Sequence, residues 1–313
     1  MAGKVFVFGS INTDLVVYVD RLPAPGETVS GGTYASFPGG KGANQAVAAA
    51  LAGATVEMHC CVGDDLFGRE RAASLEKAGV STRGVRVVPG GASGSAQITV
   101  DAFGENTIAV APGANRRFTA EGIEMPRPRQ GEVIVSLLQN EVPQAVSEEL
   151  ALRAHAAGHL VIWNLAPTIE SKPAARVLEA VDYLVCNENE LAVLSGKALG
   201  ETSGMAEAET AAREALALGA RAVLVTIGSR GSVLVAREKA VRLPAFRVEA
   251  VDTVGAGDCY CGVLAACLAE GRVIGEAMRR ASAAAAISTT RRGAQTSLPT
   301  GAEIEAFLRE RGE

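Results

Sequence analysis

The chain has 313 residues, 48% of them hydrophobic and 4% aromatic, and a formal net charge of −5. That length is enough for one large α/β domain or two small ones, and the composition is ordinary for a soluble globular protein. The negative charge and the lack of a Lys/Arg run argue against nucleic acid as a partner, and no apolar run reaches the ~20 residues of a membrane helix. Because the N-terminus has no signal-type pattern, we expect a cytoplasmic protein.

Several polar segments interrupt the N-terminal third of the chain. Lys4–Phe8 is a short apolar strand that ends at Gly9. Four later segments look extended but are more polar, as solvent-facing strands are. They are Asp14–Val19, Thr28–Phe37, Gln97–Asp101 and Thr107–Ala111. We expect them to form a small inserted β-sheet, a lid built from residues of about 12–38 and 95–112, whose open edges favour a homodimer.

The rest of the chain alternates strands and helices. A glycine-rich turn opens a helix at Ala43–Leu51, and strand Glu57–Val62 and helix Phe67–Lys77 follow. The later strands are Val133–Ser136, Leu160–Trp163, Tyr183–Cys186, Ala222–Thr226 and Ser232–Val235. The later helices are Ser147–Ala157, Ala174–Ala180, Glu188–Ser195, Ala206–Leu218, Val273–Thr289 and Gly301–Glu310. This order predicts one α/β domain over residues 1–313, with three α/β/α layers and a doubly wound, mostly parallel sheet.

The stretch Asp252–Asp258 reads Asp-Thr-Val-Gly-Ala-Gly-Asp and joins a predicted strand, Arg247–Val251, to a predicted helix, Cys259–Leu268. Its two glycines let a ligand approach the backbone closely. The helix start carries free N–H groups and a partial positive charge, which suit a phosphate. Asp258 has two interpretations of equal weight from these residues alone: a helix cap, or a base beside a bound phosphoryl group.

The cysteines and histidines give no metal-binding pattern. The cysteines are Cys60, Cys61, Cys186, Cys259, Cys261 and Cys267. None forms a Cys-x-x-Cys pair, so we expect free buried thiols rather than zinc ligands or disulfides. His59, His155 and His159 share no metal-ligand spacing, and we expect ordinary surface or core histidines.

Polar residues follow the ends of many predicted strands. They are Asn12, Asp14, Glu141, Asn187, Glu190 and the segments 226–231 and 252–258. Ligands in open α/β sheets bind beyond the carboxyl ends of the strands. Any one of these residues could be an ordinary turn former. So many together favour a binding site at one edge of the sheet.

Residues 39–44 form a glycine-rich turn with a lysine. The turn lacks the spacing of a Walker A loop, and no Rossmann Gly-x-Gly-x-x-Gly follows the first strand, which disfavours an NAD-dependent oxidoreductase. As a tight turn into a helix it needs no ligand. As a binding loop, Gly40 would admit a ligand to the backbone while Lys41 and Asn44 donate hydrogen bonds to it.

Two longer motifs resemble those of the ribokinase/phosphofructokinase-B family of carbohydrate kinases. They are Gly39-Gly40-Lys41-Gly42-Ala43-Asn44-Gln45-Ala46 and Asp252-Thr253-Val254-Gly255-Ala256-Gly257-Asp258. Others narrow the resemblance toward the ribokinases: Pro25-Gly26-Glu27-Thr28, Gly104-Glu105-Asn106, Pro112-Gly113-Ala114-Asn115 and Gly293-Ala294-Gln295. The resemblance runs from Gly9 to Gln295. Two positions depart from the family pattern: Leu165, where Pro is common, and Ser282, where His or Asn often lies near adenine.

The resemblance implies ATP-dependent phosphorylation of D-ribose at its 5-hydroxyl, with Asp258 as catalytic base and Gly255, Ala256 and Gly257 as anion hole. It implies sugar binding by Asn12, Asp14, Gly40, Lys41, Asn44, Glu141 and Asp258. It implies ATP binding by Asn187, Thr226, Gly228, Ser229, Gly231, Gly257 and Ser282. Glu190 would help to hold Mg²⁺ through water. A monovalent cation, usually K⁺, would lie beside Asp252, Val254, Ser288, Arg291, Gly293 and Ser297.

Other interpretations stay open alongside this one. Within the family, the alternative is a kinase for another pentose, deoxyribose, another small sugar or a nucleoside. A non-catalytic sugar sensor on the same fold is a third possibility, although a sensor has no need of a base at Asp258. Glu190 could equally be a solvated carboxylate in a first helical turn, and Arg291 a simple charge at a helix C-terminus.

Overall fold

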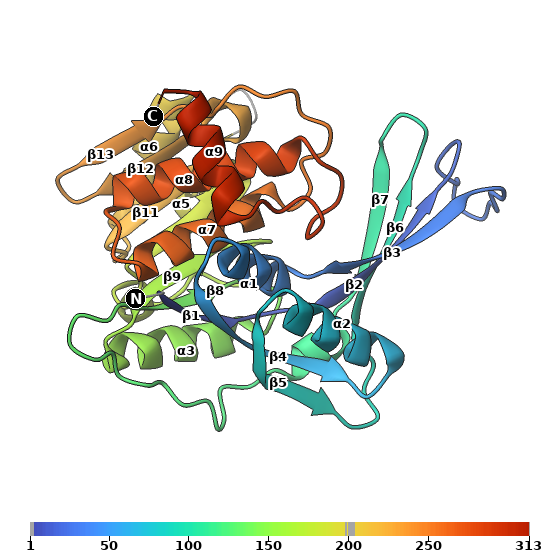
Figure 1. The fold of residues 1–313 in the computed structure, drawn as a ribbon, viewed down its shortest axis with the longest axis horizontal. Helices are drawn as coiled ribbons and strands as arrows, with labels where there is room; N and C mark the ends of the chain where they lie inside the picture. The colour runs from blue at the N-terminus through green and yellow to red at the C-terminus, as the bar shows by residue number, and fades with distance from the viewer. Residues whose placement is uncertain (1–2, 198, 200–203, 313) are drawn as a thin grey trace.

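The computed structural model describes residues 3–197, 199 and 204–312. Within them a nine-stranded sheet has the order β13-β12-β11-β10-β9-β8-β1-β4-β5, and a separate four-stranded sheet has the order β3-β2-β6-β7 (Figure 1). The strands of the large sheet are β1 (Lys4–Phe8), β4 (Thr55–Gly63), β5 (Ser81–Val88), β8 (Ile134–Leu138), β9 (Leu160–Asn164), β10 (Tyr183–Asn187), β11 (Ala222–Thr226), β12 (Ser232–Ala236) and β13 (Ala240–Leu243). Along this order from β11 to β5, neighbouring strands pair in parallel. The pairs β11–β12 and β12–β13 are antiparallel. The predicted mostly parallel sheet is confirmed.

Helices cover both faces of the large sheet and give the predicted three layers. One buried core contains residues of α1 (Lys41–Leu51), α2 (Leu66–Lys77), α7 (Ala256–Ala269), α8 (Ile274–Thr289) and α9 (Gly301–Glu310). The other contains residues of α3 (Gln144–Ala157), α4 (Ala175–Leu178), α5 (Glu188–Ser195) and α6 (Met205–Leu216). In the central strand β1, Val5 and Val7 join the first core, whereas Phe6 and Phe8 join the second. Since both faces are buried, the strand is continuously apolar.

The four-stranded sheet projects from the main body (Figure 1). It consists of β2 (Asn12–Tyr18), β3 (Thr33–Gly39), β6 (Gly94–Val100) and β7 (Asn106–Ala111). Every residue of β7 is exposed, and so are the large apolar side chains Tyr34, Phe103 (90% exposed), Ile108 and Val110. The sheet therefore carries apolar surface that the described part of the chain leaves uncovered.

Helices α1 and α7 pack against each other at unusually short range. A Cβ atom added at Gly262 would lie 2.6 Å from the Cβ of Ala48 and 3.0 Å from the nitrogen of Ala49. Ala46 and Ala49 in the alanine-rich α1 are fully buried. Small side chains on both helices thus allow a close approach, which fixes the first turn of α1 relative to the first turn of α7.

The prediction of a strand at Arg247–Val251 is wrong. The segment after β13 has no regular structure, and several of its residues line a cavity described below. Its polar–apolar alternation arises because Val248 is half-buried while Arg247 and Glu249 face outward. Two strands at the edges of the sheet, β5 and β13, were not expected, because polar residues obscure their alternation. The other expected elements are present with shifted ends.

The thiols lie inside the protein. All six cysteines are free and buried, and His59 and His159 are buried as well. In the described ranges, no group of three or more His, Cys, Asp or Glu side chains could hold a metal ion. No helix in that part of the chain is long and apolar enough to cross a membrane.

We predict that Gly262→Ala lowers the free energy of unfolding by ~1–3 kcal/mol, because the added methyl group forces α1 and α7 apart. Urea unfolding followed by circular dichroism measures the change. The matched control is Gly275→Ala in α8, where an added Cβ meets no atom within 4 Å. The control should be neutral or slightly stabilising, since alanine favours a helix over glycine. Equal destabilisation by both substitutions would contradict the packing argument.

Candidate active site

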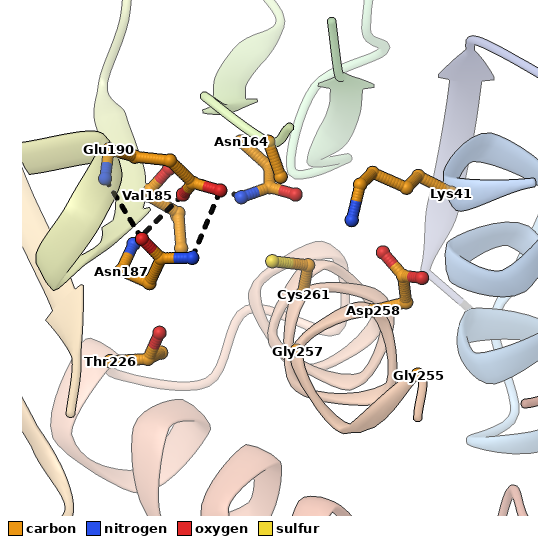
Figure 2. Close-up of a pocket in the computed structure, with 11 residues that line it drawn as sticks. Lys41, Asn164, Val185, Asn187, Glu190, Thr226, Gly255, Gly257, Asp258 and Cys261 are labelled. Carbon is orange, nitrogen blue, oxygen red and sulfur yellow. Dashed lines mark hydrogen bonds between the residues drawn. The ribbon is translucent and has the colours of Figure 1, made fainter. Parts of the chain in front are cut away.

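A polar cavity of about 210 Å³ lies at the carboxyl ends of β9, β10 and β11, beside the start of α7 (Figure 2). It is lined by Lys41, Asn164, Ala166, Val185, Asn187, Glu190, Thr226, Gly255, Gly257, Asp258 and Cys261. Residues predicted from the strand ends, the 39–44 turn and the 252–258 turn therefore meet at one edge of the sheet. A parallel sheet brings them together because its strands all end on that side.

A larger cavity of about 670 Å³ adjoins the first, and Thr226 and Gly257 line both. The other predicted nucleotide residues in its wall are Gly228, Ser229, Gly231 and Ser282. Most of the remaining wall is apolar: Ala245, Phe246, Val248, Ala250, Ala256, Tyr260, Ala285 and Ala286. A mostly apolar cavity that meets a helix N-terminus suits a flat organic ring with phosphates at the helix start.

Asp258 lies in the first turn of α7 and is only 7% exposed. Its Oδ1 accepts a hydrogen bond from Gln45 Nε2 at 2.9 Å, and its Oδ2 accepts one from Asn44 Nδ2 at 2.9 Å. The interpretation of Asp258 as a helix cap is wrong, because Gly255 occupies the N-cap position and no described side chain caps this helix. The carboxylate is instead held at the wall of the polar cavity (Figure 2).

The start of α7 is built to bind an anion. Gly255 has a φ of 76°, a left-handed conformation that glycine adopts without strain. Ala256 and Gly257 follow as the first helical residues, and the first N–H groups of a helix have no partner within it. Together with the helix dipole, the N–H groups of this turn suit an anion near Gly257, which lines both cavities, although that of Ala256 also donates to the Thr253 carbonyl at 3.3 Å.

Lys41 supplies positive charge opposite this helix start. Its backbone N–H donates to Glu141 Oε2 at 2.9 Å, and Ser10 Oγ donates to the same oxygen at 2.5 Å. The Lys41 side chain points into the polar cavity near Asp258 (Figure 2). The carboxylate of Asp258, followed by those of Glu141 and Glu190, raises the pKa of Lys41. The ammonium group therefore stays charged at neutral pH.

The predicted sugar-binding residues of the small sheet lie beside the polar cavity but do not line it. Asn12 and Asp14 belong to β2, and the Asp14 carboxylate lies directly against Gly39 of β3. Burial and the nearby charge of Glu141 raise the pKa of Asp14 to about 6. Gly40, with a φ of 92°, is the N-cap of α1 and begins the helix at this point. The carboxyl groups of Asp14 and Glu141 therefore lie near each other beside the start of α1.

Asn187 and Glu190 form a reciprocal cap at the start of α5. Asn187 Oδ1 accepts from the Glu190 N–H, and Glu190 Oε2 accepts from the Asn187 N–H, each at 2.9 Å. Glu190 is only 5% exposed, so the interpretation of it as a solvated carboxylate is wrong. Burial raises its pKa. A lone carboxylate fits Mg²⁺ only as a partner to water and substrate phosphates, which is the coordination this ion commonly has.

The residues predicted to bind a monovalent cation include two turns, around Val254 and Gly293, that Asp252 connects through hydrogen bonds. Its Oδ1 accepts from the Val254 N–H at 3.0 Å, and its Oδ2 accepts from the Gly293 N–H at 2.8 Å. The Asp252 carboxylate therefore holds the two turns together, and a carboxylate is a hard oxygen ligand of the kind that a hard cation prefers.

The remaining predicted cation positions use their side chains locally. Ser288 Oγ and Ser297 Oγ each donate to a carbonyl three residues earlier. Arg291 Nη2 lies 2.5 Å from Glu303 Oε1 in α9, so its side chain does not simply compensate the C-terminus of α8. Only the backbone carbonyls of these residues are left for a cation.

Several residues of the site were not predicted. They are Ser10, Gln45, Asn115, Gln139 and Asn164. Ser10 donates to Glu141, Gln45 to Asp258 and Asn115 to Asn12, whereas Gln139 and Asn164 are hydrogen-bonded to Gln45. The sequence signal was a polar residue within an otherwise apolar buried segment: Gln45 and Gln139 are fully buried. Such a residue needs hydrogen-bond partners, and here those partners belong to the site.

Comparison with known proteins shows the family of this chain. The model of the pfkB family carbohydrate kinases matches residues 2–301. A ribokinase of Bacillus subtilis (strain 168) is 38% identical over 305 residues, which cover 97% of this chain and 99% of that protein. A deoxyribokinase of Salmonella typhi is 34% identical over 304 residues, with 97% and 98% covered. The chain belongs to the pfkB family of carbohydrate kinases.

Solved structures agree with this assignment. The structure of Arabidopsis thaliana ribokinase complexed with ribose and ATP matches with a TM-score of 0.86 at 30% sequence identity, covering 99% of each chain. The chain described here is thus an ATP-dependent carbohydrate kinase with the ribokinase fold. The resemblance inferred from the sequence motifs is confirmed.

The raised pKa of Asp14 predicts a pH-dependent gain in stability for Asp14→Asn. Because the pKa of Asp14 is about 6 in the folded state and an ordinary aspartate has a pKa of 3.8, ionised Asp14 destabilises the folded state progressively above pH 3.8 and fully above about pH 6. Asp14→Asn should therefore raise the free energy of unfolding by roughly 2 kcal/mol more at pH 7.5 than at pH 4. Urea unfolding at both pH values measures this, with exposed Asp20→Asn as the control. An equal effect of Asp14→Asn at both pH values would refute it.

Proposed function

We propose that this kinase transfers the γ-phosphate of ATP to the 5-hydroxyl of D-ribose, giving D-ribose 5-phosphate and ADP. The observation that carries the proposal is the buried Asp258 carboxylate in the first turn of α7, next to Gly257, which lines both cavities. Ribose as the sugar is supported by the relatives described as ribokinases, among them the Arabidopsis thaliana enzyme complexed with ribose and ATP.

The proposed transfer needs a base, anion donors and a positive charge. Asp258 accepts the proton of the sugar hydroxyl while the hydroxyl oxygen forms a bond to the γ-phosphorus, and the bond from that phosphorus to the bridging oxygen of ADP breaks. Backbone N–H groups of Gly255, Ala256 and Gly257 donate to the phosphoryl oxygens. The ammonium group of Lys41 compensates their negative charge. Positioning and charge stabilisation of this kind are the main demands of phosphoryl transfer.

The sugar lies, in this proposal, between the small sheet and α1. The contacts come from Asn12, Asp14, Gly40, Lys41, Asn44, Glu141 and Asp258. Carboxylates accept from the sugar hydroxyls, and the amide and ammonium groups donate to them. The nucleotide occupies the larger cavity, against Asn187, Thr226, Gly228, Ser229, Gly231, Gly257 and Ser282. Ser282 takes the position near adenine.

Two ions complete the proposal. Glu190 would hold Mg²⁺ through water, and a Mg²⁺ bound with ATP neutralises phosphate charge. The K⁺ site would use Asp252 and the carbonyls of Val254, Ser288, Arg291, Gly293 and Ser297. A bound K⁺ would order the turn that leads into α7. Activity in K⁺ compared with choline at equal ionic strength tests that site, and equal rates would reject it.

We further propose that the four-stranded sheet, residues of about 12–38 and 95–112, is a lid on a single domain of residues 1–313. Lid closure would exclude water from the phosphoryl group. The exposed apolar side chains of the sheet support a homodimer that covers them in the cytoplasm. Sedimentation at micromolar concentration tests the dimer, and a purely monomeric protein would reject it.

A second candidate is a kinase for deoxyribose, another pentose, another small sugar or a nucleoside. Among these substrates, the 34% identity to the Salmonella typhi deoxyribokinase favours deoxyribose. A coupled assay that detects ADP, run over ribose, 2-deoxyribose, fructose and nucleosides with and without K⁺, separates the candidates. The substrate with the highest kcat/KM identifies the function.

Asp258→Asn should lower kcat by ~10²–10⁴-fold, because the asparagine amide cannot accept the hydroxyl proton. Sugar affinity, measured by isothermal titration calorimetry, should change little, since the amide keeps the size and one oxygen of the carboxylate. Asp182→Asn, a substitution of an aspartate in the turn before β10, serves as the matched control and should keep full activity. Near wild-type turnover in Asp258→Asn would remove the assigned base.

Ribose should be preferred over 2-deoxyribose by about 10²-fold in kcat/KM, because a site built to bond a hydroxyl rejects the analogue that lacks it. The two oxygens of Asp14 can accept from the 2- and 3-hydroxyls together, and without the 2-hydroxyl one charged oxygen loses its partner. Asp14→Ala should lose most of this preference as well as most of the affinity. If the wild-type enzyme uses 2-deoxyribose as well as ribose, the deoxyribose alternative replaces the ribose proposal.

A further inference from the structure

The two amide donors to Asp258 are each oriented by a second amide. Asn44 donates to Oδ2 of Asp258, and Asn44 Oδ1 itself accepts from Gln295 Nε2 at 3.1 Å. Gln45 donates to Oδ1, and Gln45 Oε1 accepts from Gln139 Nε2 at 2.8 Å. The two chains have the same direction: an outer amide donates to an inner amide, which donates to the carboxylate.

The direction matters because a carboxamide has a donor end and an acceptor end of nearly the same shape. A half-turn of the Asn44 side chain would exchange its Nδ2 and Oδ1 atoms and place an oxygen against the Asp258 carboxylate. The bond from Gln295 to Asn44 Oδ1 opposes this turn. An acceptor facing a charged acceptor costs more than a lost neutral hydrogen bond.

Gln295 reaches Asn44 from a distant part of the chain. It follows Gly293, whose N–H donates to Asp252 Oδ2 at 2.8 Å, so its turn is joined to the segment that leads into α7. Gln295 is half-buried, whereas Gln139, directly after β8, is fully buried. Gln295 can therefore be changed at less risk to folding than the matching residue of the other chain.

We propose that Gln295 is a positioning residue: it fixes the orientation of the Asn44 amide, so that Asn44 donates to the base Asp258 and keeps that carboxylate aimed at the sugar hydroxyl. The inference rests on the proposed role of Asp258 as base. Gln295 belongs to none of the proposed sugar, nucleotide and ion sites. Through Asn44 it would connect the turn after α8 to the proposed base Asp258.

The substitutions Gln295→Met and Gln295→Glu separate this role from simple space filling. Methionine removes the donor, and kcat should fall about tenfold. Glutamate has the shape of glutamine but brings an acceptor toward Asn44 Oδ1, which favours the reversed amide, and kcat should fall about a hundredfold. KM for ATP should stay within about twofold for both. The control is Gln130→Met. Gln130 is exposed and precedes β8, so it lies near the amino ends of the strands, away from the site.

A side chain that only fills space would give the opposite order, with glutamate milder than methionine, and that result would overturn the proposal. A double-mutant cycle provides a second test of the proposal. In an Asn44→Ala background, Gln295→Met should lower kcat by no more than about twofold, because the residue through which Gln295 acts is gone. A tenfold fall in both backgrounds also overturns the proposal.

A measurement that does not depend on catalysis tests the role of Gln295 separately from the proposed function. If the wild-type enzyme phosphorylates no sugar of the panel, the proposed function fails, but side-chain amide signals in a ¹⁵N NMR spectrum still show whether Gln295 orients Asn44. Gln295→Met should shift the Asn44 side-chain signals and leave those of Gln144 unchanged. Asn44 signals at their wild-type positions would overturn the proposal whatever the enzyme phosphorylates.

Discussion

The contact between α1 and α7 is the constraint on which the site depends. Helix α1 carries Asn44 and Gln45, and α7 carries Asp258, so the carboxylate meets both amides only if the helices approach closely. Gly262 provides the space for this approach, since a methyl group there would collide with Ala48. The small residues of two core helices thus decide the geometry of three polar side chains about one helical turn away.

Charge is balanced unevenly around this contact. The charges of Glu141 and Asp258 act on the pKa values of Asp14 and Lys41, and that of Glu190 acts on Lys41. Lys41 is the one cation among the described residues that line the polar cavity. The protein holds these carboxylates together by partial burial and by hydrogen bonds from amides and backbone N–H groups. The folded state therefore carries an electrostatic cost at the site, which ligands with hydroxyl donors and cations can relieve.

The sequence predicted the layers of the fold and the edge at which the site lies, because apolar strands between helices leave few alternatives. It predicted individual site residues where they follow a strand end, as Asn187 and Thr226 do. It failed where the decisive neighbour is distant in the chain: Gln45 meets Asp258 and Asn164 only after folding. The alternation at Arg247–Val251 misled because only Val248 of this segment is half-buried, while the apolar Ala250 and Val251 are exposed.

The buried thiols have a consequence for the chemistry of the cavity wall. Cys261 lines the polar cavity near Asp258, and burial raises its pKa well above the usual range. The thiolate, which is the form that reacts with oxidants and electrophiles, is therefore scarce at neutral pH. At neutral pH, Cys261 therefore adds a neutral thiol, and no further negative charge, to a cavity wall that already carries the carboxyl groups of Glu190 and Asp258.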